Sequence, residues 1–328
     1  MKRLPGQISG HVDGSGFAWA EYVAWLVETH GSLAKVALAL ADRARRGESP
    51  ESIERALRRL RDSDGDGGSY GARLVRTFGL PKPVAARTAW MGLYHSRFCD
   101  LPVPLCLEIL RVWDRPPITT SADGAFIALG LAHTALRAGD RDAAVAHLAR
   151  AATPSKKLPA AHVEHLLGSA FVASGRGDAR ACGALLEQAA LVIDGSDLGG
   201  ERAAFVARLN DQRAYAMLNA KERDLAGARA LYEAIDHVGP PFARMKRAAG
   251  LAYVAWKSNE LDAALREARA AVTHAGDGGL LRQRAIALGL LAHVATGQER
   301  HDAKSRAAAI AASLQDEDLL LRQARQGA

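Results

Sequence analysis

Apolar residues recur every three or four positions along most of the chain, which is the spacing of the buried face of an α-helix. The stretch 17–29, FAWAEYVAWLVET, crowds its large apolar side chains onto one side. A second stretch, 49–61, opens with a serine that can cap a helix and a proline suited to its first position. Its buried stripe is Ile53, Leu57 and Leu60. Runs of β-branched and aromatic residues are scarce, so the pattern predicts an all-α protein.

A break in the regular pattern divides the chain into two parts. WDRPPI at 113–118 carries two consecutive prolines, which favour extended geometry and bar a helix. We therefore predict an N-terminal helical bundle over residues 1–117 and a second helical domain over residues 118–328. Before the break, three shorter helices are predicted, at 71–81, 83–98 and 103–113. Four aromatic residues there have the helical spacing of a buried core: Trp90, Tyr94, Phe98 and Trp113.

Beyond the break, the pattern changes to long helix pairs. Each unit has an apolar helix, a polar turn and then an alanine-rich helix, and five such units can be laid over one another. Their spacing centres on roughly 40 residues, which is typical of a stacked repeat architecture. The turns are predicted at Ala138–Asp142, Gly175–Ala179, Lys221–Leu225, Ser258–Asp262 and Gly297–Asp302.

The repeated unit resembles the tetratricopeptide-repeat superfamily. In the first unit, small and large residues follow that family's pattern at Ala132, Gly139, Asp140, Ala144, Leu148 and Ala151. Gly139 and its counterpart in the fourth unit, Asn259, suit a helix end that needs positive φ. The resemblance implies a right-handed α-solenoid of about five helical hairpins, in which each hairpin covers the apolar side of its neighbour.

The same resemblance implies where a partner would bind. In such arrays the first helix of each hairpin lines a concave groove that commonly holds extended peptides or partner helices. The lysine and asparagine clamp with which some family members hold a terminal carboxylate is not reproduced, so a chaperone tail is not expected. The groove's mixed to basic charge favours an acidic or polar partner. The inward positions are His133, His165, Arg213 and Tyr253.

Residues 32–61 weakly resemble the DNA-reading part of a bacterial helix-turn-helix regulator, with 49–61 as the inserted helix. Four arginines of that helix would then meet phosphates or base edges: Arg55, Arg58, Arg59 and Arg61. The segment between the two helices is longer and more polar than the usual tight turn. Glutamates one turn earlier can pair with two of the arginines, so a solvated, salt-bridged face is the other interpretation.

The loop DSDGDGG follows directly. Asp62, Asp64 and Asp66, with Gly67 after them, reproduce the first half of a calcium-binding EF-hand loop. The twelfth position, where a bidentate carboxylate should stand, is Arg73. An arginine there adds repulsion instead of two ligands. We therefore favour an ordinary Asp/Gly loop between two helices, and the sequence leaves open whether it binds a cation.

Two groups of histidines invite a comparison with metal or nucleophile sites. His162 and His165 lie three apart on one predicted helix, but no spacing suggests a third zinc ligand. His95 lies near Cys99 and Asp100 on one short segment, without a supporting catalytic motif. We interpret both groups as packing, groove or turn residues, and predict neither a metal nor a cofactor.

Charge and cysteine content bear on the expected partners and on the cellular compartment of the protein. The formal net charge of +7 permits contact with nucleic acid or acidic proteins without demanding it. Three cysteines without paired spacing indicate a reducing compartment. The sequence contains neither a secretion signal nor an apolar run of roughly 18 residues that could span a membrane. We expect a cytoplasmic protein.

The sequence offers a large curved surface and no convergent set of acid, base, nucleophile or metal ligands. We therefore expect a non-catalytic, regulatory scaffold that binds a protein or peptide. The alternative is a transcription regulator whose N-terminal domain binds DNA and whose repeats sense a ligand or mediate dimerisation. A third interpretation is an enzyme with a site assembled across repeats. The array can also be read as packing only on the first domain or on a second copy of itself.

Overall fold

The computed structural model describes residues 16–43, 47–63 and 65–327. Every regular element in these ranges is a helix, so the prediction of an all-α protein is confirmed. No single helix in the same ranges is both long and apolar enough to cross a membrane. Helices α1 and α2 pass that test of length and composition only when taken together, and they meet at 85°.

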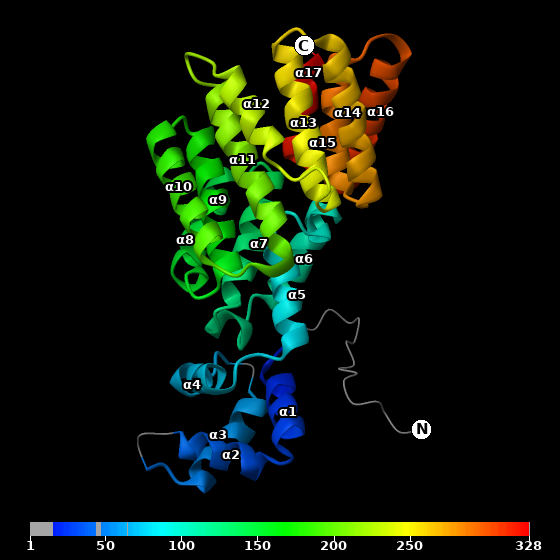
Figure 1. Cartoon of the computed structure of the whole chain (residues 1–328). Helices are drawn as coiled ribbons and strands as arrows, with labels where there is room; N and C mark the ends of the chain where they lie inside the picture. Colours follow the sequence, from blue (N-terminus) through cyan, green and yellow to red (C-terminus); the bar gives the residue numbers. More distant parts are fainter. Residues whose placement is uncertain (1–15, 44–46, 64, 328) are drawn as a thin grey trace.

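The first four helices form an N-terminal unit at one end of the molecule (Figure 1). They are α1 (Trp19–His30), α2 (Leu33–Asp42), α3 (Pro50–Arg61) and α4 (Gly68–Phe78). Ser49 caps α3 as predicted, because its side chain accepts a hydrogen bond from the Ser52 N–H. Trp19 and Tyr22 are buried in this unit's core, and their polar ends donate to the carbonyls of Gly65 and Gly79. These two bonds hold the ends of α4 against α1.

A short segment connects this unit to the long helices. It contains α5 (Lys82–Gly92), the 3₁₀ turn η1 (Arg97–Asp100), α6 (Val103–Trp113) and the 3₁₀ turn η2 (Ile118–Thr120). The single helix predicted over 83–98 is wrong, because α5 ends at Gly92 and Leu93 is extended. A Cβ on Gly92 would lie 2.4 Å from the carbonyl oxygen of Phe126, so glycine allows α5 to touch α7 closely. The chain then turns inward.

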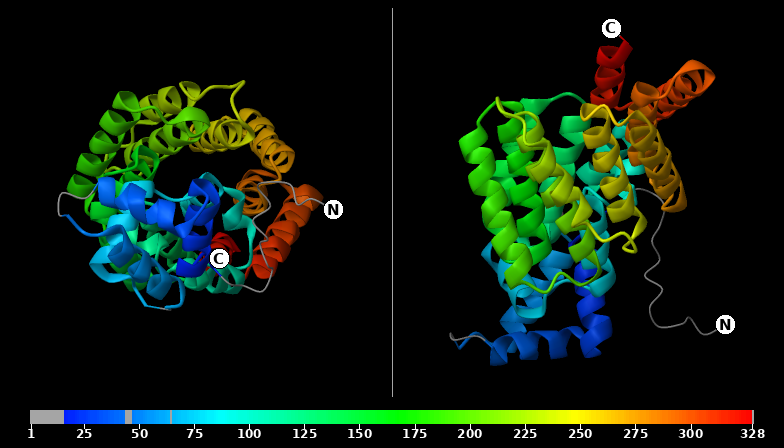
Figure 2. Two further views of the ribbon diagram at one scale, coloured as in Figure 1. Left: turned by 90° about the horizontal axis from the view of Figure 1, so that it is seen from below. Right: turned by 45° about the horizontal axis from the view of Figure 1, so that its top comes forward.

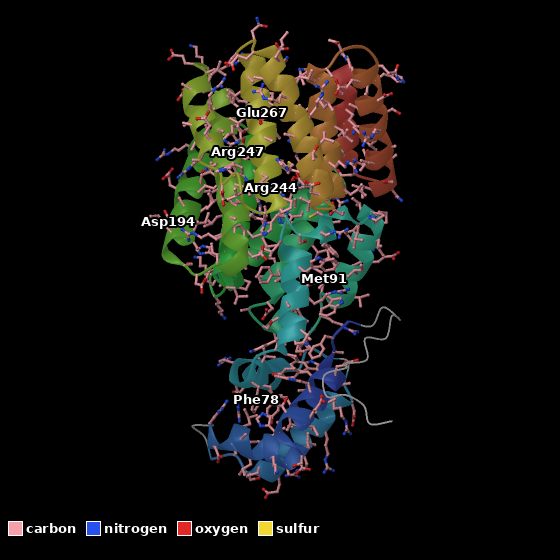
Figure 3. All side chains as sticks on the ribbon, turned by 45° about the vertical axis from the view of Figure 1, so that its right-hand side comes forward. Phe78, Met91, Asp194, Arg244, Arg247 and Glu267 are labelled. Atoms are coloured by element: carbon pink, nitrogen blue, oxygen red, sulfur yellow. The ribbon has the colours of Figure 1, made fainter. Side chains whose placement is uncertain are left out.

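The hydrophobic core continues through residue 117. Ile118, Ile127 and Leu131 belong to the same buried cluster as Trp19 and Leu110. In the stick view of Figure 3, Met91 of α5 lies between Phe78 of the N-terminal unit and the long helices. The boundary predicted at residue 117 therefore falls inside a continuous core.

Ten helices follow as five consecutive pairs, and within each pair the two helices pack on each other. The pairs are α7 (Gly124–Arg137) with α8 (Arg141–Ser155), α9 (Pro159–Gly175) with α10 (Ala179–Gly195), α11 (Arg202–Leu218) with α12 (Leu225–Glu233), α13 (Pro241–Lys257) with α14 (Leu261–Asp277), and α15 (Leu281–Val294) with α16 (Gly297–Leu314). The turn η3 (Gly199–Glu201) precedes α11. Fully buried alanines on the second helices, such as Ala144, Ala189 and Ala268, let neighbouring helices approach closely.

Four of the five predicted turns coincide with the observed breaks between paired helices. Gly139 and Asn259 have φ of 78° and 61°, which confirms the positive φ expected at these positions. The fifth turn, predicted at Gly297–Asp302, is wrong because these residues form the first turns of α16. The chain reverses at Ala295 and Thr296 instead. The first turns of α16 are rich in exposed polar residues, and this composition led to the wrong prediction of a loop there.

The pairs are arranged around a ring when the molecule is viewed along the helices (Figure 2). The last helix, α17 (Glu317–Gly327), packs on α15 and α16 and also contacts α7 of the first pair. The turn η1 contacts α15 as well. Helices distant in sequence thus meet around the segment Leu93–Leu101, and this meeting point organises the polar residues described next.

Candidate binding surface

Charged side chains converge on Tyr94, at the point where the chain turns inward after α5. The Tyr94 backbone N–H donates to Glu164 at 3.3 Å, and the Tyr94 hydroxyl accepts from Arg282 at 2.8 Å. The Arg208 guanidinium lies over the tyrosine ring, 4.8 Å from its centroid. Tyr94 was predicted to be core, and it packs against a buried cluster that includes Phe242 and Met245 as well as against these arginines. We call the residues of this region the polar centre: Tyr94, His133, Arg137, Glu164, Arg208, Arg282 and Asp316.

Glu164 is one of the two carboxylates that balance these cations. Its side chain is fully buried and accepts two hydrogen bonds from Arg208, at 2.5 and 2.7 Å, and pairs with His133 at 2.8 Å. Burial alone would raise the pKa of Glu164, but the charges of Arg208 and His133 outweigh it and hold that pKa below its ordinary value. Glu164 therefore stays ionised at neutral pH and cannot act there as a proton donor.

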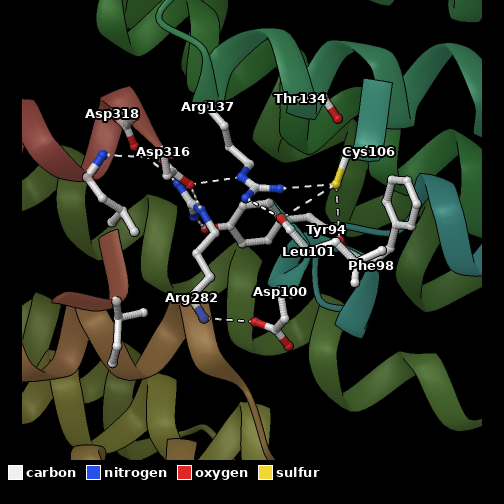
Figure 4. A network of polar contacts seen from close by, with 12 residues as sticks. Tyr94, Phe98, Asp100, Leu101, Cys106, Thr134, Arg137, Arg282, Asp316 and Asp318 are labelled. Carbon is white, nitrogen blue, oxygen red and sulfur yellow. Dashed lines mark hydrogen bonds and ion pairs between the residues drawn. The ribbon is translucent and has the colours of Figure 1, made fainter. Parts of the chain in front are cut away.

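Asp316 is the other carboxylate, and Figure 4 shows its contacts. One of its oxygens accepts from Nε of both Arg137 and Arg282, each at 2.8 Å, and the second oxygen caps α17 by accepting from the Leu319 N–H. Arg137 also donates to the carbonyl of Leu101 at 2.8 Å. Burial opposes ionisation, but the two arginines keep the pKa of Asp316 below its ordinary value. This aspartate ties α7, α15 and α17 together.

Along helices α11, α13 and α15, the side chains near Tyr94 are more buried than those two or three turns further on. Arg208 of α11, Lys246 of α13 and Arg282 of α15 all lie near Tyr94. Residues seven or eleven positions further on lie two or three turns along the same helix face. Those positions are Tyr215 on α11, Tyr253 and Lys257 on α13, and His293 on α15. These side chains are less buried than those of the polar centre. Tyr215 is 57% exposed, and His293 is also exposed.

Aromatic and basic side chains contact one another at this open end. The Tyr253 and Trp256 rings lie 5.6 Å apart, and His293 meets the indole edge-on at 4.2 Å. The Lys257 ammonium lies 3.9 Å from the centre of the Trp256 ring and 5.4 Å from that of Tyr253. Cation–π attraction therefore holds the lysine over the aromatic pair.

Further cations surround this cluster. Burial lowers the pKa of His293, and the charges of Lys257 and Arg300 lower it further. The pKa of Lys257 is likewise lowered by burial and by Arg223. A shallow hollow beside His293 is lined by Arg300, Lys304 and Gln323. In the described ranges, no carboxylate forms an ion pair with any of these lysines and arginines. We call this set the aromatic–basic surface: Tyr215, Arg223, Tyr253, Trp256, Lys257, His293, Arg300 and Lys304.

The structure places the four predicted groove residues on four different helices. His133 is 7% exposed and bonded to Glu164, so it is part of the polar centre and cannot face a partner in this conformation. His165 is half-buried next to His162 on α9, and burial lowers its pKa. Arg213 forms an ion pair with a glutamate of α10 at 2.8 Å. Tyr253 alone belongs to the aromatic–basic surface.

The arginines suggested for DNA contact lie on the solvent side of α3, opposite its buried stripe. Arg58 forms the predicted pair with the glutamate one turn earlier, at 2.6 Å, and Arg61 pairs with the neighbouring aspartate at 2.8 Å. Arg55 donates instead to the backbone carbonyl of Glu51 at 3.4 Å. All four side chains, Arg59 included, are exposed, which suits both a solvated face and a phosphate contact.

The Asp/Gly loop has local partners for its acidic side chains. Asp62 pairs with Arg61, and Asp66 accepts from the Gly68 N–H at 2.8 Å, while Asp64 lies outside the described residues. Arg73, at the twelfth position of the compared calcium loop, bonds Glu48 at 2.6 Å. In the part of the chain that the structure describes, no group of three or more metal-binding side chains is found.

His95, Cys99 and Asp100 do not come together as a nucleophile and its base. The His95 ring bonds Glu201 at 2.5 Å, and Asp100 accepts from the backbone N–H of Arg282 at 2.8 Å. Burial raises the pKa of the Cys99 thiol to about 12, which keeps it protonated and unreactive at neutral pH. Each of the three side chains has a separate packing or bonding role.

Sequence reasoning missed most members of both clusters. Glu164, Arg208 and Arg282 stand among apolar neighbours on their helices, and a charge at a buried position of the helical pattern was the available signal. Lys257 and Trp256 are adjacent at the end of a helix, where composition alone gives no sign of a shared surface.

Comparison of the chain with protein-family models, with curated proteins and with solved structures found no match in any of the three.

Proposed function

We propose that this chain is a non-catalytic regulatory scaffold that binds a protein or peptide on the inner face of a right-handed, tetratricopeptide-like array of five helical hairpins. The observation that carries the proposal is that this face already holds another segment of the chain, made of turns and the 3₁₀ helix η1. Leu93–Leu101 runs inside the array and is bound through the Tyr94 N–H, the Leu101 carbonyl and the Asp100 carboxylate. A face that binds one segment of chain through backbone and side-chain groups is suited to bind another further along.

Two further observations agree with this proposal. The buried carboxylates of the polar centre are saturated by arginines, which suits a structural role better than acid–base chemistry. Cys99, Cys106 and Cys182 are buried and unpaired, in keeping with the reducing environment of the cytoplasm, where we place the protein.

Affinity capture from an extract of the source cells tests the proposal. The full chain is the bait, with and without nuclease treatment. We expect a protein partner that is retained after nuclease, binds directly when purified, and is lost when Arg213→Ala and Tyr253→Ala are combined. The matched control is Lys157→Ala with Arg180→Ala, two exposed cations that lie in the turn between α8 and α9 and on α10. Retention only of nucleic acid, or equal retention by both variants, would contradict the proposal.

A second candidate function is transcription regulation, in which the N-terminal unit binds DNA and the array senses a ligand or mediates dimerisation. The exposure of all four arginines on one side of α3 favours it. Gel retardation with duplex DNA should then weaken steeply with salt, because each phosphate contact releases counterions. Arg58→Ala with Arg59→Ala should remove most of the retardation. An unchanged signal in this variant would eliminate the second candidate.

A further inference from the structure

We propose that the aromatic–basic surface binds an acidic segment of a protein partner, an inference that rests on the proposed scaffold function and specifies the chemistry of its ligand. The surface lies on the same helix faces as the polar centre, two to three turns further along α11, α13 and α15. It is therefore the uncovered continuation of a face whose covered part already holds the turns and the 3₁₀ helix of Leu93–Leu101.

Charge complementarity is the first argument. In the polar centre, each carboxylate meets arginines, as Glu164 meets Arg208 and Asp316 meets Arg282. At the open end, Lys257 and Arg300 have no such partner among the described residues. Like charges gathered this closely repel one another, and incoming carboxylates would relieve that repulsion. A neutral or basic segment would bury the cations unpaired, which is unfavourable.

The geometry of the aromatic residues favours a peptide over single-stranded nucleic acid. Proteins that bind single strands stack bases on free aromatic faces. One face of Trp256 is occupied by the Lys257 ammonium at 3.9 Å, and His293 packs on the same side chain in a T-shaped arrangement with the ring centres 4.2 Å apart. Tyr215, more than half exposed, has room for the apolar side chain of a peptide. The surface therefore offers cations for carboxylates and an aromatic side chain for one apolar anchor.

Fluorescence anisotropy with defined probes tests the inference on the full chain. The main probe is a short, labelled, glutamate-rich peptide that contains one leucine and one phenylalanine. The comparison probes are the same peptide with every glutamate replaced by glutamine, and a single-stranded oligothymidine of equal charge. We expect saturable binding of the acidic peptide that weakens with salt, and at least tenfold weaker binding of the glutamine peptide and of the oligothymidine.

Charge reversal locates the binding site. Lys257→Glu with Arg300→Glu should weaken binding of the acidic peptide by at least about tenfold. Lys157→Glu with Arg180→Glu makes the same change in net charge elsewhere on the array and should leave the affinity within about twofold. Both variants change exposed or half-buried side chains, and thermal melting of each should match the unmodified chain.

Each remaining outcome overturns the inference. Tighter binding of oligothymidine would assign the surface to nucleic acid, and equal binding of the glutamine peptide would show that the cations are not involved. Equal weakening by both charge reversals would show that binding depends on the net charge of the protein and not on the aromatic–basic surface. Self-association that is lost only in Lys257→Glu with Arg300→Glu would make the occupant a second copy of this chain. If a captured partner still binds that variant fully, the inference fails while the proposed scaffold function stands.

Discussion

Asp316→Asn is the most direct test of how α7, α15 and α17 are held together. The side chain is fully buried, and one oxygen accepts from both Arg137 and Arg282 at 2.8 Å, while the other caps α17. Asparagine keeps the volume and one oxygen but has no charge, and its second group is an N–H donor. If the remaining oxygen caps α17, both arginine N–H groups lose their acceptor. If it turns to the arginines, the cap is lost.

The size of the effect follows from the burial of the two arginines, whose side chains are 3% and 5% exposed. Removing one partner from a buried ion pair destabilises a protein by about 3–5 kcal/mol. Arg137 keeps its bond to the Leu101 carbonyl and Arg282 keeps Asp318, so we expect a loss near the lower end, about 3 kcal/mol. For a chain of this size, that is a fall in melting temperature of about 4 °C.

Thermal melting at neutral pH measures the loss, and Asp318→Asn is the control. Asp318 is 30% exposed and contacts Arg282 and Arg322 at 3.1 and 3.0 Å, so its removal should destabilise by less than about 1 kcal/mol. Limited proteolysis should cut α17 first in Asp316→Asn. A melting temperature that is unchanged, or no lower than that of Asp318→Asn, would refute the idea that Asp316 holds α7, α15 and α17 together.

The pH dependence of the same variant supplies an independent check. The folded pKa of Asp316 is depressed, so its stabilisation is complete above the unfolded pKa of about 3.9 and is lost as pH falls toward the folded pKa. The difference in unfolding free energy between the unmodified chain and Asp316→Asn should therefore be constant from pH 8 to about pH 5. It should shrink on acidification below about pH 4. A difference that widens with acid would contradict the assignment.

Three further substitutions test other parts of the structure. Glu164→Gln leaves Arg208 buried without a carboxylate, and should reduce the free energy of unfolding in urea by about 3–5 kcal/mol. Gly92→Ala places a methyl group 2.4 Å from a backbone oxygen of α7. It should lower the free energy of unfolding by about 1–3 kcal/mol, and the melting temperature with it. The control is Gly183→Ala, which has open space around it and should be neutral or stabilising. Ser49→Ala removes the cap of α3 at a cost of about 1 kcal/mol, which amide exchange should report as faster exchange in α3 alone.

Features with a local physical cause could be predicted from the sequence. A serine cap followed by proline fixes the start of α3, and it does so whatever else the chain does. Gly139 and Asn259 end their helices because positive φ is tolerated there. The alternation of apolar helices with alanine-rich ones gave the all-α class and four of the turns. In these cases the residues that determine a helix start or a turn lie within a few positions of it in the sequence.

Features that depend on distant contacts could not be predicted in this way. At Gly92, α7 lies so close to α5 that a Cβ would meet the Phe126 carbonyl oxygen, and no residue near Gly92 in the sequence indicates this contact. Arg282 meets Tyr94 across 188 positions, and Arg137 meets Asp316 across 179. Periodicity predicted that His133 faces inward from its helix, but only the fold shows that its ring is buried and bonded to Glu164 at 2.8 Å.

The two parts of the inner face together indicate what a partner must provide. Where the face is covered, the chain supplies Glu164 and Asp316, and the arginines can be buried because their charges are matched. Where it is open, Lys257 and its neighbours are half-buried or exposed, and no carboxylate of the described residues pairs with them. On the proposal made here, an acidic partner completes at the open end the charge matching that the chain achieves internally. The cations then also reject neutral and basic segments, which would bury them unpaired. The polar centre holds the helices in place beforehand, so little ordering is left for the binding step.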